Sequence, residues 1–222
     1  MNGAHIIRQA TLADVSFLAD VIMFAEKSNS NKFGLATLFG LSEAEVKKYL
    51  ISILREEIYG CEFSISSFLI AELDHQPAAA IGGWIEEWGD EQPSKILKAN
   101  LIASTFPVES MKVIRSHAEL IKDIQIEREK HTLQLEYAYV LPEHRGKNLI
   151  QSLMQKHIDN ALLKFPALVK CHLQVFGNND TATKAYGKLG FQIIRKYVSG
   201  NKDILNFLPY SEKCLMETLV KK

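Results

Sequence analysis

The sequence predicts an α/β fold of the α+β kind, in which helices cover a mixed sheet of strands. Two observations support this prediction. Short apolar runs typical of strands alternate along the chain with longer runs in which apolar residues recur every three or four positions, as in amphipathic helices. In the C-terminal half these strand-like and helical runs interleave, which favours parallel pairing for part of the sheet.

The first elements are a strand and two helices. Residues 5–10 have the apolar pattern of a short strand, and Thr11 with Asp14 resembles a capping box ahead of a run with helical periodicity. Ser42 and Glu45 form a second capping box, so a second helix is predicted after them.

A hairpin and a helical segment follow. Residues 62–86 have the pattern of two antiparallel strands joined at "DHQP", where Asp74 and Pro77 favour a turn. Residues 87–130 contain two runs of helical periodicity that Pro107 separates, because proline interrupts a helix. We therefore expect a pair of helices inserted between the hairpin and the next strand.

The rest of the chain returns to strands and helices in turn. Strands are predicted at residues 132–140, 167–176, 191–198 and 213–220, and helices at residues 149–165 and 180–189. No repeat, low-complexity tract or linker divides the 222 residues, so we expect one domain over residues 1–222.

Composition excludes several classes of partner. The 26 basic and 26 acidic residues cancel, so we expect no nucleic-acid partner and no attraction to an anionic membrane. No run reaches the roughly 18 apolar residues of a membrane span, and the N-terminus lacks the pattern of a signal peptide. A soluble cytoplasmic protein is the expectation.

Neither the cysteines nor the histidines have the spacing of a metal site. Cys61, Cys171 and Cys214 include no Cys-x-x-Cys pair, and the 7 histidines include no His-x-x-x-His pair. We expect no metal, and we expect the cysteines to be small buried side chains in a reducing compartment.

The segment "PEHRGKNLIQSLM", residues 142–154, runs from a strand through a polar turn into a helix. The first N–H groups of a helix lack intrahelical partners and lie at the positive end of its dipole. Such a turn suits a phosphate group, and ordinary strand-to-helix turns share its shape.

This segment and "NDTATKAYGKLGF", about thirty residues later, together resemble the two central motifs of the GNAT superfamily of acyl-coenzyme A-dependent N-acetyltransferases. The opening "IRQATLADVSFLADVI" resembles the first strand and helix of that family. The resemblance covers most of the chain except residues 87–130. It implies the GNAT fold: a mixed, largely antiparallel sheet of six to seven strands flanked by helices, here with a helical insertion between the third and fourth strands.

The resemblance also implies where coenzyme A binds. The family's turn reads Q/R-x-x-G-x-G/A, and its main-chain N–H groups hold the pyrophosphate. The implied cofactor-binding residues are Arg145, Gly146, Lys147, Asn148, Leu149, Ile150 and Gln151. Asn148 stands in place of a glycine and suits positive φ, whereas Ile150 stands in place of a small residue and could crowd the phosphates.

The strand before this turn and the second motif complete the implied cofactor site. In the family the main chain of the fourth strand, here Ala138, Tyr139 and Val140, binds the pantetheine arm like an added strand. In the second motif, Asn179 caps a helix and Ala182 leaves room beside the cofactor.

Two residues are implied to be catalytic. Tyr186 occupies the position of a general acid that protonates the departing thiolate, because a phenol with a pKa near ~10 stays protonated at neutral pH. Glu136 is the candidate base, and a solvated or ion-paired glutamate is the alternative. Strand alternation places Glu136, Ala138 and Val140 on one face. The family's fifth-strand glutamate is Gln174 here, which cannot ionise.

By the same resemblance, residues 87–130 lie near the acceptor site. The segment "EEWGDE" places the carboxylates of Glu86, Glu87, Asp90 and Glu91 beside Trp88, which would suit a cationic amine. An exposed acidic loop at the end of a strand is the alternative interpretation.

The function implied is transfer of an acetyl group from acetyl-CoA to a primary amine by direct attack in a ternary complex. The acceptor can be a small molecule or a protein, and the sequence leaves a homodimer open. Two other hypotheses stay open: a catalytically inactive sensor or scaffold that binds CoA with the same fold, and an interaction domain with a blocked turn.

Overall fold

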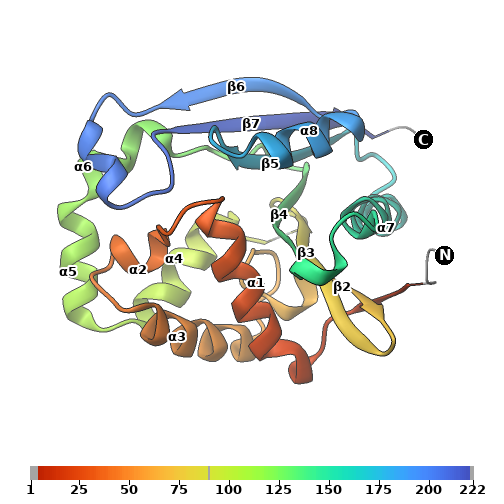
Figure 1. Ribbon diagram of the computed structural model, residues 1–222, viewed down its shortest axis with the longest axis horizontal. Helices are drawn as coiled ribbons and strands as arrows, with labels where there is room; N and C mark the ends of the chain where they lie inside the picture. Colours follow the sequence, from red (N-terminus) through yellow and green to blue (C-terminus); the bar gives the residue numbers. More distant parts are fainter. Residues whose placement is uncertain (1–4, 90, 221–222) are drawn as a thin grey trace.

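The computed structural model describes residues 5–89 and 91–220, and these form a seven-stranded sheet with strand order β1-β2-β3-β4-β5-β7-β6 (Figure 1). The strands are β1 (Ile6–Gln9), β2 (Phe68–Leu73), β3 (Gln76–Ile85), β4 (Leu133–Val140), β5 (Lys170–Phe176), β6 (Gln192–Val198) and β7 (Glu212–Leu219). Neighbouring strands pair antiparallel except β4 and β5, which are parallel. The predicted mixed, largely antiparallel sheet is confirmed.

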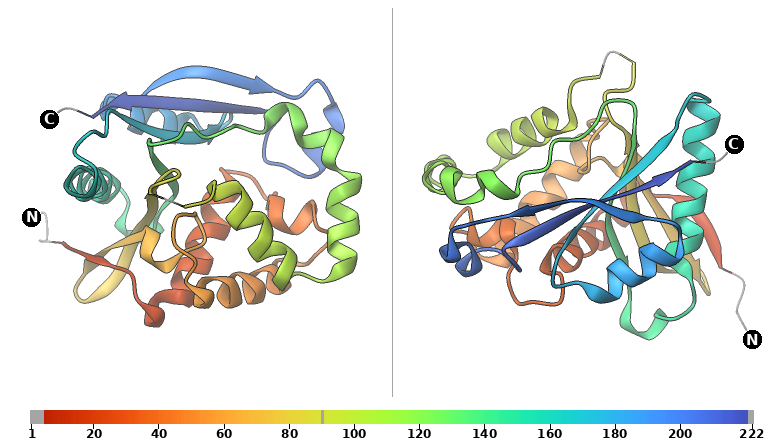
Figure 2. Two further views of the ribbon diagram at one scale, coloured as in Figure 1. Left: turned by 180° about the vertical axis from the view of Figure 1, so that it is seen from behind. Right: turned by 90° about the horizontal axis from the view of Figure 1, so that it is seen from above.

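Helices cover both faces of this sheet (Figure 2). The α-helices are α1 (Val15–Lys27), α2 (Gly34–Thr37), α3 (Glu43–Glu56), α4 (Ser94–Thr105), α5 (Val108–Ser116), α6 (Ala118–Ile121), α7 (Leu149–Lys164) and α8 (Asp180–Lys188). The 3₁₀ turns are η1 (Leu12–Asp14), η2 (Ile65–Ser67), η3 (Lys122–Ile124), η4 (Pro142–His144) and η5 (Lys202–Asn206).

The sheet separates two apolar cores. Helices α1 to α4 pack on one face, and α7 with α8 packs on the other. Alternate residues of β2 enter the two cores: Phe68 and Ile70 the first, Leu69 and Ala71 the second. This division explains why Phe68 to Ala71 of β2 are all apolar, because a strand covered on both faces has no solvent side.

Both predicted capping boxes are present. Asp14 accepts hydrogen bonds from the main chain and hydroxyl of Thr11, and it also binds the guanidinium of Arg8 on β1. Glu45 accepts from the main chain and hydroxyl of Ser42 at the start of α3. These contacts fix where α1 and α3 begin relative to the sheet.

The hairpin differs from the prediction in two ways. Residues 62–67 are not a strand. The Glu57 carboxylate accepts hydrogen bonds from Ile65 N, Ser66 N and the Ser64 hydroxyl, and the segment curves around this carboxylate. The turn is made by Asp74 and His75 alone, both with left-handed φ of 50° and 62°. Pro77 already belongs to β3.

The insertion between the third and fourth strands is confirmed as helical. It comprises α4, α5 and the short α6, and the last of these was not predicted. Helix α4 contributes Leu101 and Ile102 to the core on the α1 face, and Phe106 follows it into the same core. The insertion is therefore part of the folded body and covers one end of the first core.

Candidate active site

The neighbouring strands β4 and β5 separate partway along their length. They pair in register only from Leu133 opposite Cys171 to Leu135 opposite Leu173. Beyond this point, β4 continues to Val140 and β5 to Phe176 with no pairing between them in the described chain. The unpaired edges leave main-chain donors and acceptors free to bind an extended ligand.

A β-bulge marks the point of separation. The pairing of β4 with β3 shifts register between Ala80 and Gly82, and Tyr137 opposite this shift has a left-handed φ of 56°. The extra residue breaks the alternation of the strand. Leu135 and Ala138, three residues apart, both face the core on the α7 side, as does Val140, whereas Tyr137 and Tyr139 face the α1 side.

The bulge also corrects the predicted position of Glu136. Strict alternation would put Glu136 on the same face as Ala138, but its carboxylate meets Arg128, on the side of Tyr137 and the inserted helices. The prediction was wrong because it assumed no extra residue in β4.

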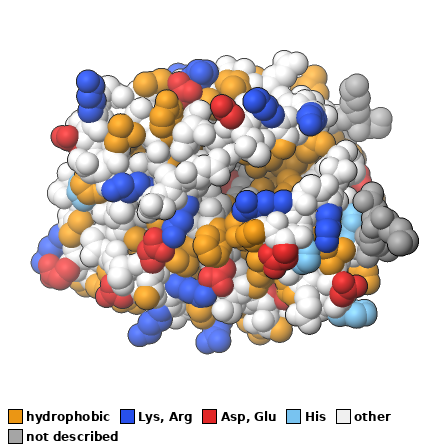
Figure 3. Space-filling view, in the orientation of Figure 1, with side chains coloured by type: hydrophobic (Ala, Val, Ile, Leu, Met, Phe, Trp, Pro, Cys, Tyr) orange, Lys and Arg blue, Asp and Glu red, His pale blue; other side chains and the backbone are white. Residues whose placement is uncertain are grey.

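A cavity of about 450 Å³ occupies the gap between the two strands. Its walls come from β4 and β5, from α8 on one side, and from α1, α2 and the inserted helices on the other. The space-filling view shows a hollow on this face between α8 and α1 (Figure 3). Glu136, Ala138 and Tyr186, all named from the sequence, line this one cavity together with Asn179 and Ala182.

The turn between β4 and α7 has the predicted backbone shape. Gly146 has φ 80° and Asn148 has φ 57°, both left-handed. Asn148 precedes the first residue of α7 and makes no side-chain cap hydrogen bond, so its side chain does not occupy the N–H groups at the helix start. Asparagine replaces glycine here because it tolerates this conformation better than other L-residues.

The side chains around this turn divide into exposed and packed groups. Arg145, Lys147 and Gln151 are exposed, so two positive charges lie close in sequence to the N–H groups at the start of α7. Leu149 is buried and Ile150 packs against the core on the α7 face. The side chain of Ile150 is thus accommodated at least in part by the core.

Tyr186 reaches the cavity from the middle of α8. The helix is fixed at its start by Asn179, whose side-chain oxygen accepts from Ala182 N at 3.2 Å and from the amide of Asn29 at 3.1 Å. Burial raises the pKa of Tyr186 to about 12. The phenol is therefore protonated at every pH at which the protein would be assayed.

The carboxylate of Glu136 belongs to a buried charge network. Arg128 Nη2 lies 2.5 Å from Glu136 Oε1 and 3.0 Å from Glu62 Oε1, and Lys98 Nζ lies 3.0 Å from Glu62 Oε1. Burial alone would raise the pKa of Glu62, but the charges of Arg128 and Lys98 outweigh it and lower it to about 2. Glu62 is thus a fixed negative charge beneath the cavity.

Sequence reasoning missed four charged residues of the cavity: Lys98 and Arg128 of the network above, Glu26 on α1 and Lys213 on β7. Burial raises the pKa of Glu26, against the opposing charges of Lys98 and Lys213. Burial lowers the pKa of Lys213, and the charge of Glu26 offsets part of this effect. In the sequence each resembles an ordinary solvated charge, and only the fold brings them to the cavity.

The acidic segment after β3 does not offer its first carboxylate to an amine. Glu86 is 2% exposed, and it accepts hydrogen bonds from Trp84 Nε1, Ser94 N and the Ser94 hydroxyl, so it anchors the start of α4. Glu87 lies 3.5 Å from Lys130. Trp88 and Glu91 line a different cavity, beside α7, and Asp90 lies outside the described residues.

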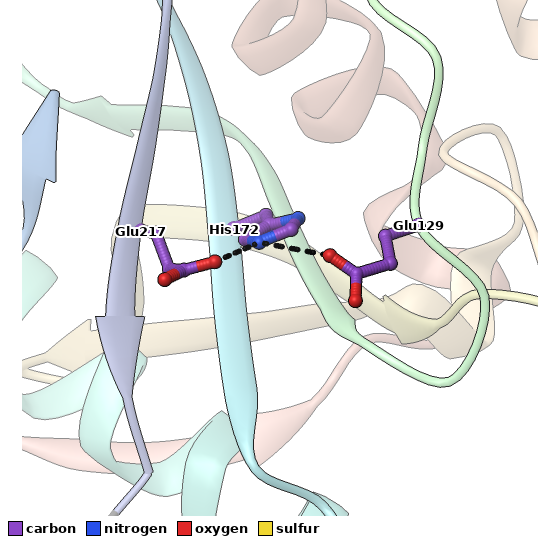
Figure 4. A group of neighbouring side chains, drawn as sticks. All are labelled: Glu129, His172 and Glu217. Atoms are coloured by element: carbon purple, nitrogen blue, oxygen red, sulfur yellow. Dashed lines mark hydrogen bonds and ion pairs between the residues drawn. The ribbon is translucent and has the colours of Figure 1, made fainter. Parts of the chain in front are cut away.

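Three side chains that the sequence did not connect could hold a metal ion by their ligand types. Glu129, His172 and Glu217 come from three separate segments, and their ligand atoms lie within 4.8 Å of one another (Figure 4). Lys170 Nζ lies 3.0 Å from both oxygens of Glu129 and 3.6 Å from Glu217. Lys170 already pairs with both carboxylates, so we interpret the group as an ion-pair network that ties β5 to β7 and to the segment after α6.

The cysteines are placed away from solvent. Cys61, Cys171 and Cys214 are buried, and burial raises the pKa of Cys171 far above its ordinary value. A buried thiol of this kind is a poor nucleophile. Among the described residues, no helix combines the length and the apolar composition needed to cross a membrane.

Solved structures with the same architecture include several acetyltransferases. An N-acetyltransferase from Staphylococcus aureus Mu50 is 16% identical, with a TM-score of 0.64 over 96% of this chain and 100% of that one. The yncA protein of Salmonella typhimurium, solved with its cofactor acetyl-CoA, is 12% identical, with a TM-score of 0.53; the match covers 99% of this chain and 96% of that one. The ribosomal-protein-S18-alanine N-acetyltransferase of Escherichia coli is 11% identical, with a TM-score of 0.51; the match covers 99% of this chain and 96% of that one.

At these identities the likeness shows a shared fold. A search of curated proteins found no match. The sequence model of the Acetyltransferase (GNAT) family matches residues 41–191, which is more than half of the chain and includes both motifs. The chain therefore belongs to the GNAT acetyltransferase family.

Proposed function

We propose that this acetyltransferase transfers the acetyl group of acetyl-CoA to a primary amine by direct attack in a ternary complex. The observation that carries the proposal is the single cavity in the gap between β4 and β5. Ala138 and Tyr186 line it on the side of the cofactor motifs, and Glu136 lines it on the side of the inserted helices. Two substrates can therefore meet within it, and the buried thiols offer no site for an acyl-enzyme.

Acetyl-CoA supplies an activated acetyl thioester, and the residues of this chain fit it in two places. The main chain of Ala138, Tyr139 and Val140 is unpaired on the β5 side and binds the pantetheine arm. The N–H groups from Gly146 to Gln151 bind the pyrophosphate. In this stretch Gly146 and Asn148 have left-handed φ and α7 begins at Leu149, which is a backbone shape that suits an anion. Asn179 and Ala182 border the arm from α8.

Tyr186 donates a hydrogen bond to the leaving sulfur. With a pKa of about 12, it is 3 to 4 units less acidic than a thiol near ~8.5, so full proton transfer costs roughly 5 kcal/mol. The phenol therefore stabilises the developing thiolate chiefly as a donor, and the free thiol obtains its proton from solvent. We therefore keep Tyr186 at the leaving sulfur, as the sequence implied, but as a hydrogen-bond donor more than as a general acid.

Glu136 accepts a proton from the acceptor amine, directly or through water. Arg128 binds Oε1 of this carboxylate, and Glu136 lines the cavity. The ammonium form loses one proton before attack, the nitrogen bonds to the acetyl carbon as the carbon–sulfur bond breaks, and the nitrogen then loses a second proton. Both protons reach solvent, and the CoA thiolate takes up one proton from solvent, so the net reaction releases one proton.

Asn148, Ile150 and Gln174 are the sequence features that favour an inactive CoA sensor. Gln174 lines the cavity and still supplies no ionisable group, but the other two residues now support the sensor less strongly. Asn148 adopts the left-handed conformation that a glycine would have, and Ile150 packs against the core. Neither residue now gives a reason to expect that the pyrophosphate turn is blocked.

The test combines binding with turnover. Titration calorimetry with acetyl-CoA should show binding, and a thiol-release assay over a panel of primary amines should show release that depends on both substrates. Mass spectrometry of the product should show an N-acetyl amine. Binding without release for any amine would favour the sensor, and no binding would contradict the proposal itself.

A further inference from the structure

The charged groups around the cavity are paired unequally. Glu136 and Arg128 form an ion pair, and Glu62 beneath the cavity pairs with both Arg128 and Lys98. This network contains two acids and two bases, so its charges balance. This network therefore presents no net charge to a ligand in the cavity.

Two further charges line the same cavity outside this network. Within residues 5–89 and 91–220, the carboxylate of Glu26 and the ammonium of Lys213 lie within ion-pair distance of no opposite charge. Lys213 Nζ lies 4.9 Å from the centre of the Phe176 ring on β5, at the mouth of the gap between the strands. The charge of each partly offsets the effect of burial on the pKa of the other, and both side chains line the one cavity.

An acid and a base that are partly buried and have no ion-pair partner are costly for the free protein, because neither is fully solvated or paired. A ligand that carries an ammonium and a carboxylate would complete both pairs. An amine without a carboxylate would satisfy Glu26 and leave Lys213 unpaired.

We propose that the acceptor is a small amino acid-like molecule whose amine lies against Glu26 and whose carboxylate binds Lys213. The inference rests on the amine acetylation proposed above and names the class of its acceptor. Acetylation occurs at the amine by the reaction proposed above. The acceptor carboxylate forms no covalent bond. Its role is to bind and orient the molecule.

The rest of the cavity wall predicts an apolar body for this acceptor. On the side of α2 and the insertion, the cavity wall includes an apolar group, Leu38, Phe39, Ile102, Ile114 and Ile124, beside the polar side chains of Lys98, Gln125 and Arg128. A cavity of about 450 Å³ that also receives the acetyl end of the pantetheine arm has room for one amino acid side chain of moderate size. Leucine and its relatives have the required charge and shape.

A matched pair of acceptors tests the proposal. Leucine and 3-methylbutylamine have the same apolar body and each has one primary amine, and only leucine carries the carboxylate. We expect the wild-type enzyme to have a kcat/KM for leucine about tenfold to a hundredfold above that for 3-methylbutylamine, because charge-assisted hydrogen bonds to the carboxylate contribute only with leucine.

Variants of Lys213 assign the preference to this side chain. Lys213→Gln should remove most of the preference through a higher KM for leucine, and Lys213→Arg should restore part of it. Lys202→Gln, an exposed lysine on η5, is the control and should keep the wild-type preference. Thermal unfolding of each variant shows whether the fold is retained.

The outcomes separate this inference from the function on which it rests. Equal or better use of 3-methylbutylamine would overturn the inference and leave amine acetylation standing. A preference for leucine that survives in Lys213→Gln would overturn the assigned contact. Binding of acetyl-CoA without release for either acceptor would also overturn the inference, whereas failure to bind acetyl-CoA would remove the proposed function and the inference together.

Discussion

Arg128, on the segment that follows the inserted helices, binds the carboxylate of Glu136 on β4 at 2.5 Å. This contact joins the insertion to the strand that borders the cavity. The same guanidinium also donates to Glu62 and to the Ser94 hydroxyl at the start of α4. The insertion therefore holds the proposed proton acceptor in place, in addition to forming a wall of the cavity.

The buried network predicts a large effect on stability when Glu62 is neutralised. Glu62 is fully buried, and Glu62→Gln would leave Lys98 with no acidic partner in ion-pair distance and Arg128 with one. We expect the free energy of unfolding to fall by about 3 to 5 kcal/mol, as found when one partner of a buried ion pair is removed. Urea unfolding measures this loss.

The control is Glu119→Gln, which removes an exposed glutamate paired with Lys122 on the surface. Its urea midpoint should match the wild type, because exposed ion pairs contribute little. A Glu62 variant as stable as this control would show that the network does not stabilise the fold.

His157 predicts a loss of stability in mild acid. Burial lowers the pKa of His157 to about 4 in the folded state, where the ring shares a hydrogen bond of 3.1 Å with Ile81 O. An unfolded histidine titrates near ~6.5, so the unfolded chain binds the extra proton between these values. The stability contributed by the neutral ring is complete above about pH 6.5 and is lost as pH falls toward about 4, by roughly 3 kcal/mol.

Urea unfolding at several pH values between 7 and 4 measures this effect. His157→Gln can keep a donor to Ile81 O and cannot titrate, so its stability should change less over that range. His75→Asn, at an exposed histidine in the hairpin turn, should change as the wild type does. A wild-type pH dependence in His157→Gln would contradict the prediction.

Tyr186 predicts a loss of turnover with cofactor binding retained. Tyr186→Phe removes the only polar atom of the side chain and keeps its packing against Phe191. We expect kcat to fall about 10²-fold, typical of losing a proton or hydrogen-bond donor at the reacting atoms. The Kd for acetyl-CoA should stay within about twofold.

The raised pKa of Tyr186 makes a second readout available. Because the phenol loses its proton only near pH 12, Tyr186 should cause no decline of kcat between pH 8 and 10. Tyr59→Phe, at an exposed tyrosine after α3, is the control. Unchanged kcat in Tyr186→Phe would remove the residue from the mechanism.

The parts of the site that are local in sequence could be predicted from it. The turn with Gly146 and Asn148 lies where a strand, glycine and amphipathic helix follow one another, and its backbone angles agree with the expectation. The helix with Tyr186 likewise begins at Asn179, whose side chain makes the cap that the sequence indicated. Capping, turn chemistry and periodicity act over a few residues, so one chain segment contains the information.

The parts that depend on tertiary contacts could not be predicted. Tyr137 is a bulky residue with left-handed φ in the middle of a strand, and only its burial against the first core holds it there. Glu86 has the sequence of an exposed acidic loop, yet it is folded under the start of α4. Glu26 and Lys213 lie far apart along the chain and meet only across the cavity.

The left-handed backbone of Asn148 predicts which substitutions the pyrophosphate turn accepts. Asn148 has φ 57° and ψ 23°, a conformation that costs most L-residues about 1 to 2 kcal/mol and β-branched residues more. Asn148→Gly should therefore keep the affinity for acetyl-CoA, whereas Asn148→Val should move the N–H groups at the start of α7 and weaken binding about tenfold. Lys156→Val places the same side chain at an exposed position within α7 and should bind as the wild type does. Calorimetry measures the three Kd values, and equal affinity in Asn148→Val would mean that the turn does not position the donors that hold the cofactor.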